Sequence, residues 1–144
     1  MIRILGFAAA VLVGLGGAAQ AQGIDPINTR QTGLDLLSGT FANVRNVVAA
    51  NGDVKTLEAS GKAIQRWGTL MPSLFPPGSD KGATKAAPAI WTDNAGFQTA
   101  AAALASAGGM LAGSAKAGDV EAVKASVKAI GDACGACHKG YRLQ

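Results

Sequence analysis

The chain has 144 residues, of which 49% are hydrophobic and 15% are charged, so it is a globular chain of single-domain size rather than a disordered one. Its formal charge is +4, with lysine and arginine residues scattered singly among acidic ones, which gives no support for nucleic-acid binding. Abundant alanine and glycine with few aromatic residues favour helices over strands.

The N-terminus has the three-part pattern of a secretory signal peptide. Arg3 supplies a positive charge, residues 4–15 are almost entirely apolar, and small residues follow in an A-x-A pattern that ends at Ala21. We expect cleavage after residue 21, which divides the chain into a signal peptide, 1–21, and a mature domain, 22–144. An uncleaved membrane anchor is the alternative, but the apolar stretch is short for a span of about 20 residues. We expect no membrane contact after cleavage.

The first predicted helix carries apolar residues at heptad-like spacing between Ile27 and Val48. Asp25-Pro26 is a typical start, with the aspartate as cap and the proline in the first turn. Asn51-Gly52 is a typical end, because both residue types tolerate a left-handed backbone.

A second helix is predicted from about Asp53 to Pro72, where proline ends it. Residues 72–92 contain several prolines and glycines and are predicted to form a loop. A loop of this length is uncommon in a compact domain and often has a function.

Two further helices are predicted, starting near Asp93 and at Asp119, with a turn at residues 113–118 between them. In the third, small residues at Ala101 and Gly108 would allow a neighbouring helix to approach closely. The fourth has the most regular apolar stripe of the chain, which consists of Val120, Val123, Val127, Ile130, Cys134, Cys137 and Tyr141. Four amphipathic helices predict an all-α fold, an antiparallel up-down-up-down four-helix bundle, with another all-α arrangement as the alternative.

The last helix contains the C-x-x-C-H motif of c-type haem attachment, at Cys134, Cys137 and His138. Residues three and four apart share a helix face. Both cysteines can therefore reach the vinyl groups of one haem, with His138 as the axial iron ligand. We expect one covalently attached haem c.

Three other interpretations of this motif are weaker. A zinc site needs four ligands, and the chain has only two cysteines and one histidine. A thioredoxin-like pair would lie in a βαβ context. A disulfide is possible in an oxidising compartment, but it does not explain why the only histidine directly follows the second cysteine.

The sixth iron ligand decides between gas binding and a low-spin electron carrier. Met71 and Met110 are the thioethers of the mature chain. In an up-down-up-down bundle Met110 lies towards the wrong end, whereas Met71 is at the correct end but beside Pro72. Leu34 on the first helix falls at the level of the haem, where an aliphatic side chain would shield the iron without binding it. Leu34 could equally be an ordinary core residue.

The mature chain resembles the cytochromes c′. The resemblance rests on the Thr29–Leu34 stretch T-R-Q-T-G-L, on the proline-rich loop that ends in P-A-I-W-T-D at Asp93, and on C-G-A-C-H-K-G-Y-R at Cys134–Arg142. The position of the motif close to the C-terminus is the most specific feature, because in many other c-type cytochromes it lies near the N-terminus.

The resemblance implies a periplasmic protein whose high-spin haem has His138 as its only protein ligand. It implies that Leu34 crowds the open distal face and that Arg30 and Gln31 contact the haem periphery. Arg142 corresponds to a basic residue on the proximal side. For Arg30 and Arg142, an ordinary solvated helix face is the alternative.

The resemblance also implies binding of nitric oxide and carbon monoxide, and frequent homodimers that use the first two helices. Electron transfer to an unknown redox partner protein is the second hypothesis, and a six-coordinate carrier with a methionine ligand is its sharper form. We expect no enzymatic activity, because no second histidine or acid–base pair lies near the inferred distal face.

Overall fold

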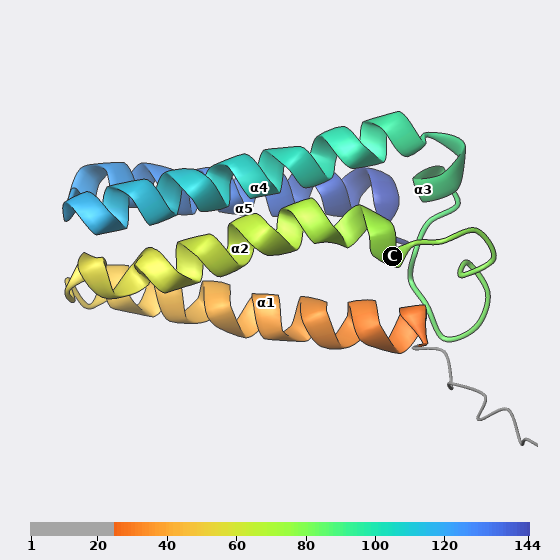
Figure 1. The fold of residues 1–144 in the computed structure, drawn as a ribbon, viewed down its shortest axis with the longest axis horizontal. Helices are drawn as coiled ribbons and strands as arrows, with labels where there is room; N and C mark the ends of the chain where they lie inside the picture. Colours follow the sequence, from red (N-terminus) through yellow and green to blue (C-terminus); the bar gives the residue numbers. More distant parts are fainter. Residues whose placement is uncertain (1–24) are drawn as a thin grey trace, which may run out of the picture.

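A computed structural model describes residues 25–144; the signal peptide expected at 1–21 lies outside them. Four long helices run alternately up and down, and Figure 1 shows α1 and α2 in one layer beside α4 and α5. The predicted antiparallel four-helix bundle is thereby confirmed. The long helices are α1 (Pro26–Ala49), α2 (Glu58–Leu70), α4 (Asn94–Ala117) and α5 (Val120–Tyr141).

Aspartate side chains start three of these helices. Asp25 accepts a hydrogen bond from the Ile27 amide at the start of α1, and Asp93 and Asp119 cap α4 and α5 in the same way. Asp53 caps the 3₁₀ turn η1 (Val54–Leu57), which leads into α2. Each such cap stabilises its helix by about 1 kcal/mol, and the starts predicted for the helices agree with the structure.

The end of α4 differs from the sequence prediction. A turn was expected to begin at Gly113, but α4 continues to Ala117 and ends at Gly118, whose φ of 74° is left-handed. Ala112 and Ala115 are buried in this last part of the helix. Their burial offsets the cost of about 1 kcal/mol that a glycine imposes within a helix.

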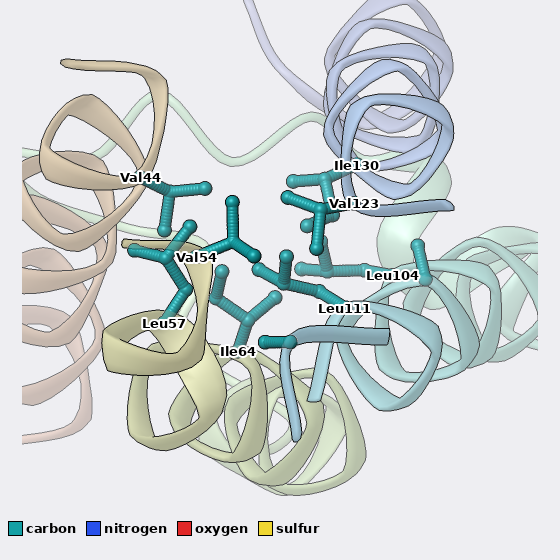
Figure 2. Packing of buried hydrophobic residues seen from close by; sticks show 10 residues of the cluster. Val44, Val54, Leu57, Ile64, Leu104, Leu111, Val123 and Ile130 are labelled. Atoms are coloured by element: carbon teal, nitrogen blue, oxygen red, sulfur yellow. The ribbon is translucent and has the colours of Figure 1, made fainter. Parts of the chain in front are cut away.

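The core lies between the four helices, and Figure 2 shows its apolar side chains converging from all of them. Ile64 of α2 and Leu111 of α4 are completely buried, as is Val123 of α5. Val44 is the completely buried member from α1. Burial of each such side chain stabilises the fold by about 1.5–3 kcal/mol.

Helices α2 and α4 approach closely because each has a glycine that lies against the backbone of the other helix. A Cβ on Gly108 would lie 2.5 Å from the backbone nitrogen of Gln65, and one on Gly68 would lie 2.6 Å from that of Ala105. The close approach predicted from the small residues around Gly108 is therefore confirmed.

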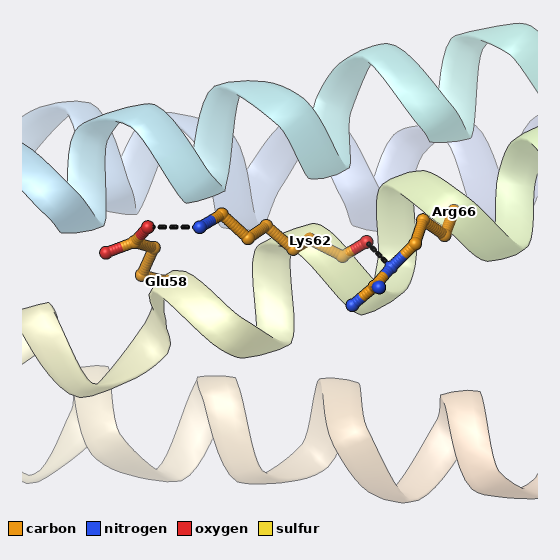
Figure 3. Close-up of polar contacts among 3 residues, drawn as sticks. All are labelled: Glu58, Lys62 and Arg66. Carbon is orange, nitrogen blue, oxygen red and sulfur yellow. Dashed lines mark hydrogen bonds and ion pairs between the residues drawn. The ribbon is translucent and has the colours of Figure 1, made fainter.

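The outer face of α2 is polar. Figure 3 shows Lys62 bonded to the Glu58 carboxylate one turn earlier, while the Arg66 Nε donates to the Lys62 carbonyl at 3.3 Å. Exposed pairs of this spacing stabilise a helix by about 0.3–0.5 kcal/mol. This face is therefore a solvated surface that contributes little to the stability of the bundle.

The connection between α2 and α4 is only partly a loop. It contains the 3₁₀ turn η2 (Met71–Leu74) and the single helical turn α3 (Ala89–Thr92), so the expected loop 72–92 is reduced to residues 75–88. Figure 1 shows this segment at the end of the bundle where α1 begins and α5 ends. Within the described residues, no helix is both long and apolar enough to cross a membrane.

Candidate haem site

A cavity of about 670 Å³ opens between α1 and α5, and the motif residues line it. Cys134, Cys137 and His138 come from α5, as the three-and-four spacing of the sequence predicted. Leu34 lines the same cavity from α1. The haem-attachment motif therefore lines the cavity from one helix, and an aliphatic side chain lines it from another.

All predicted site residues outside the motif line this cavity. Arg30, Gln31 and Leu34 lie in the first turns of α1, and Arg142 directly follows the last turn of α5. The structure therefore brings together all seven residues that the sequence singled out. Residues 84–86 of the loop and Phe97 of α4 complete the walls at this end.

The environment of the motif keeps its thiols and imidazole neutral. Burial raises the pKa of both Cys134 and Cys137 above the usual thiol value. Burial is also the main cause that lowers the pKa of His138, and the positive charge of Arg142 lowers it further. A neutral imidazole is the form that ligates a metal ion.

Arg142 lies beside the histidine on the α5 side of the cavity. Its Nη1 is 3.5 Å from His138 Nδ1, one helical turn away. Within residues 25–144, His138 Nε2 makes no hydrogen bond to the protein. Arg142 is exposed and also lines the cavity, so its position agrees with the solvated-surface alternative as well as with a residue beside the haem site.

Arg30 is the most buried charged residue of the described chain, with 2% of its surface exposed. Its guanidinium donates hydrogen bonds to the loop, to the Ser79 hydroxyl at 2.8 Å, the Ser79 carbonyl at 2.7 Å and the Thr84 hydroxyl at 2.8 Å. It also stacks on the Phe75 ring at 4.4 Å. The alternative of a solvated helix face for Arg30 is wrong, because the loop covers it.

Gln31 holds the same loop by a different contact. Its side-chain amide donates to the Ala83 carbonyl at 2.7 Å, although the residue itself is exposed. The polar groups of Arg30 and Gln31 therefore face the loop, while both residues also line the cavity.

Leu34 belongs to a second apolar cluster beside the cavity, with Met71, Ile90, Phe97 and Trp67. Leu34 therefore both lines the cavity and packs in the core. Trp67 carries a buried indole N–H that has no hydrogen-bond partner within residues 25–144.

The two methionines take different positions. Met71 is 5% exposed and lines the cavity, at the end of the bundle where the sequence placed it. Met110 is 50% exposed and does not line the cavity, in agreement with its expected position towards the other end. Met71 is therefore the thioether that remains close to the motif.

The sequence did not identify Tyr141 and its aromatic neighbours as part of the site. Tyr141 lines the cavity, packs edge-on against Phe97 and donates a hydrogen bond to the Asp93 carboxylate at 2.7 Å. Phe97 in turn packs against Phe75 of the loop, with ring centroids 5.0 Å apart. The position of Tyr141 on the apolar stripe, one turn after Cys137, was the signal that could have found it.

The residues present fit a haem c. The cavity has the volume of a cofactor pocket and is mostly apolar, with two thiols and an imidazole on one helix face. Both cysteines are free thiols. Among residues 25–144, no three histidine, cysteine, aspartate or glutamate side chains are grouped to hold a metal ion, so the carboxylates that a zinc site requires are not beside the motif there.

Comparison with known proteins finds relatives that carry two different names. The sequence model of the family described as Cytochrome C' matches residues 25–142. The chain is 34% identical to cytochrome c′ of Rubrivivax gelatinosus over 121 residues, which are 82% of this chain and 94% of that protein. It is also 37% identical to cytochrome c-556 of Agrobacterium tumefaciens, over 64% of this chain and 74% of that one.

A solved structure extends the similarity to the fold. The chain superposes with a TM-score of 0.75 on a nitric oxide complex of a leucine-to-alanine variant of cytochrome c′ from Alcaligenes xylosoxidans. The sequences are 29% identical, and the match covers 83% of this chain and 94% of that one.

Proposed function

This chain belongs to the cytochrome c′ family, and from that premise we propose that it is a periplasmic protein that carries one covalent haem c and binds nitric oxide and carbon monoxide. The family implies a c-type haem as cofactor. A member of known structure binds nitric oxide. The proposal adds a five-coordinate, high-spin iron, residues 22–144 as the mature domain and the removal of residues 1–21.

One observation carries the proposal: Leu34 on α1 lines the same cavity as Cys134, Cys137 and His138 on α5. The thiols would form the two thioether bonds, and His138 would be the axial ligand. A haem held there supplies an iron position that binds a diatomic gas. Leu34 offers neither a lone pair nor a hydrogen bond, so it shields that position without occupying it.

Arg142 is the residue proposed to act on the proximal side. Its guanidinium lies 3.5 Å from His138 Nδ1, so it is placed to donate a hydrogen bond to a ligand on the His138 side. Arg30 and Gln31 are proposed to lie at the haem periphery, where both line the cavity.

Replacing Leu34 by alanine tests the proposal. Because a bulky side chain must move before a gas can bind, L34A is expected to raise the affinity for carbon monoxide by roughly tenfold or more. Met110→Ala is the control, since Met110 is a large apolar residue that is 50% exposed and does not line the cavity. An L34A protein with the carbon monoxide affinity of M110A would contradict the proposal.

A six-coordinate electron carrier is the second candidate, and the position of Met71 favours it. Met71 is buried, lines the cavity and is a thioether, the ligand that raises the potential of c-type haems. Replacing Met71 by alanine should convert a low-spin spectrum to a high-spin one if this candidate is correct. The gas-binding proposal expects the high-spin spectrum already in the wild-type protein.

Electron transfer with an unknown partner protein is compatible with gas binding, and we propose no enzymatic turnover. We also propose a homodimer through α1 and α2. Leu36 on α1 and Leu70 at the end of α2 are both large apolar residues that are more than half exposed. Light scattering of L36A and of a Leu70→Ser variant tests this, because loss of the contact would give monomers.

A further inference from the structure

The segment of residues 75–88, here called the cavity loop, is tied to both helices that bound the cavity. Arg30 and Gln31 of α1 bond to Ser79, Ala83 and Thr84 of this loop. Three consecutive residues of the loop, 84–86, form part of the cavity wall. The cavity loop lies at the end of the bundle where α1 begins and α5 ends, as Figure 1 shows, and it connects these two helices there.

The connection to α5 uses backbone groups. The Ala87 amide donates to the Tyr141 carbonyl at 3.0 Å, and the Leu143 amide donates to the Lys85 carbonyl at 2.8 Å. Ala86 and Arg142 form an isolated antiparallel bridge between these two bonds. Side-chain substitution leaves such bonds in place, so this connection is independent of the side-chain contacts on α1.

The connection to α1 depends mainly on one side chain. Nη1 of Arg30 donates to the Leu74 carbonyl and the Ser79 hydroxyl, and Nη2 donates to the Ser79 carbonyl and the Thr84 hydroxyl. A guanidinium has four terminal N–H groups. These four bonds therefore use all of them, and every acceptor lies in η2 or the cavity loop. Only Nε–H remains for any other partner.

All of these acceptors are neutral. Within residues 25–144, no carboxylate forms an ion pair with the buried guanidinium of Arg30. A buried charge without its hydrogen bonds is costly. Opening the cavity loop would break several charge-assisted bonds at once, and each of them is stronger than a bond between neutral groups. Arg30 therefore makes the closed position of the loop the favourable one.

We propose that Arg30 is a positioning residue that holds the cavity loop closed and so restricts the access of small ligands to the cavity. The access part of this inference rests on the proposed function, whereas the anchoring part does not. The inference assigns the terminal N–H groups of Arg30 to the loop rather than to the cofactor, which limits its contact with the haem periphery to Nε–H and to its charge.

Limited trypsin digestion of the haem-containing protein tests the anchor, because Lys81 and Lys85 are exposed residues of the cavity loop. In Arg30→Gln, cleavage after these lysines should be faster by about tenfold or more, the ratio expected from losing one charge-assisted bond. Cleavage after Lys128, in the middle of α5, reports global unfolding and should stay unchanged.

Arg45→Gln is the matched control. Arg45 is another arginine of α1, it is exposed, and it stacks on Phe41 rather than on the loop. Ser79→Ala provides a second test from the loop side with Arg30 intact, and it should also accelerate loop cleavage. In the double variant, the increase in cleavage rate should be smaller than the product of the two single increases. Loop cleavage in R30Q that equals that in R45Q would overturn the anchor.

Carbon monoxide rebinding after flash photolysis tests access. R30Q should rebind from solution several-fold faster than wild type, while R45Q should not. A faster-cleaved loop with an unchanged rebinding rate would overturn the restriction of access. If the wild-type protein binds no carbon monoxide, the proposed function fails, and the digestion still decides whether Arg30 anchors the loop.

Discussion

Trp67 of α2 fills the space that a side chain at Gly33 of α1 would occupy. A Cβ built on Gly33 would overlap the six-membered part of the indole ring. The next residue, Leu34, lines the candidate haem site. The absence of a side chain at Gly33 therefore allows α1 to pack on Trp67 with Leu34 at the cavity.

Gly33→Ala is accordingly expected to destabilise the protein by about 1–3 kcal/mol, the usual cost of overpacking a core. Gly39→Ala on the same helix is the control. No atom lies within 4 Å of a Cβ at Gly39, so alanine should stabilise the helix by up to about 1 kcal/mol. Urea unfolding of both variants measures the difference, and equal shifts of the midpoint would show that Trp67 does not need the space.

Gly108 should be equally intolerant of a side chain, for a different reason. Its Cβ would meet the backbone of α2, 2.5 Å from the Gln65 nitrogen, and backbone cannot move aside as a side chain can. Gly108→Ala should therefore cost about 2 kcal/mol or more. Gly113→Ala, in open space five residues along α4, should be neutral or stabilising. Thermal unfolding distinguishes the two, and a stable G108A would mean that α2 and α4 can separate without cost.

The pKa of Tyr141 should depend on Asp93. The hydrogen bond to the Asp93 carboxylate is the main cause that raises the pKa of this tyrosine above its usual value. Asp93→Asn removes the charge and keeps a residue type that caps helices, so it should lower the pKa of Tyr141 towards the usual value of about 10 without loss of α4.

Tyr141 is the only tyrosine of the chain, so its labelled ring carbon gives a single NMR signal to titrate. Asp119→Asn, which changes the equivalent cap of α5, should leave that titration unchanged. Because the folded-state pKa is raised, the stabilisation is complete below the unfolded pKa and is lost as the pH rises through the folded value. A Tyr141 titration in D93N that equals the wild-type one would contradict the assignment.

Arg142 should influence the nitric oxide complex from the His138 side. Its Nη1 lies 3.5 Å from His138 Nδ1. Arg142→Ala should therefore weaken the binding of a ligand on the His138 side and change the dissociation rate of nitric oxide by roughly tenfold. Lys139→Ala is the control, since Lys139 is a neighbouring exposed cation that does not line the cavity. Identical nitric oxide complexes of R142A and wild type would remove the proposed proximal role.

Local signals in the sequence predicted most of the fold. Asp25, Asp53, Asp93 and Asp119 each precede an apolar helical pattern, and each of them caps a helix or a 3₁₀ turn. Helical periodicity alone placed the motif of α5 on one face. These features depend on neighbours within four residues, which is why they can be inferred without the tertiary structure.

Long-range contacts account for what the sequence did not predict. Whether Arg30 is buried depends on Ser79, 49 positions away, and a single charged residue gives no sign of such a partner. The continuation of α4 beyond Gly113 depends on the burial of Ala115 against other helices. The hydrogen bond between Tyr141 and Asp93 joins residues 48 apart, so the aromatic part of the site was also out of reach.

The optical spectrum of the ferrous protein, recorded before and after the addition of nitric oxide, tests the central claim most directly. We expect a broad high-spin Soret band that changes when nitric oxide is added, because the proposal has Leu34 shield the sixth position without binding the iron. A sharp low-spin spectrum with split α and β bands that does not respond to nitric oxide would contradict the claim and would identify Met71 as the sixth ligand.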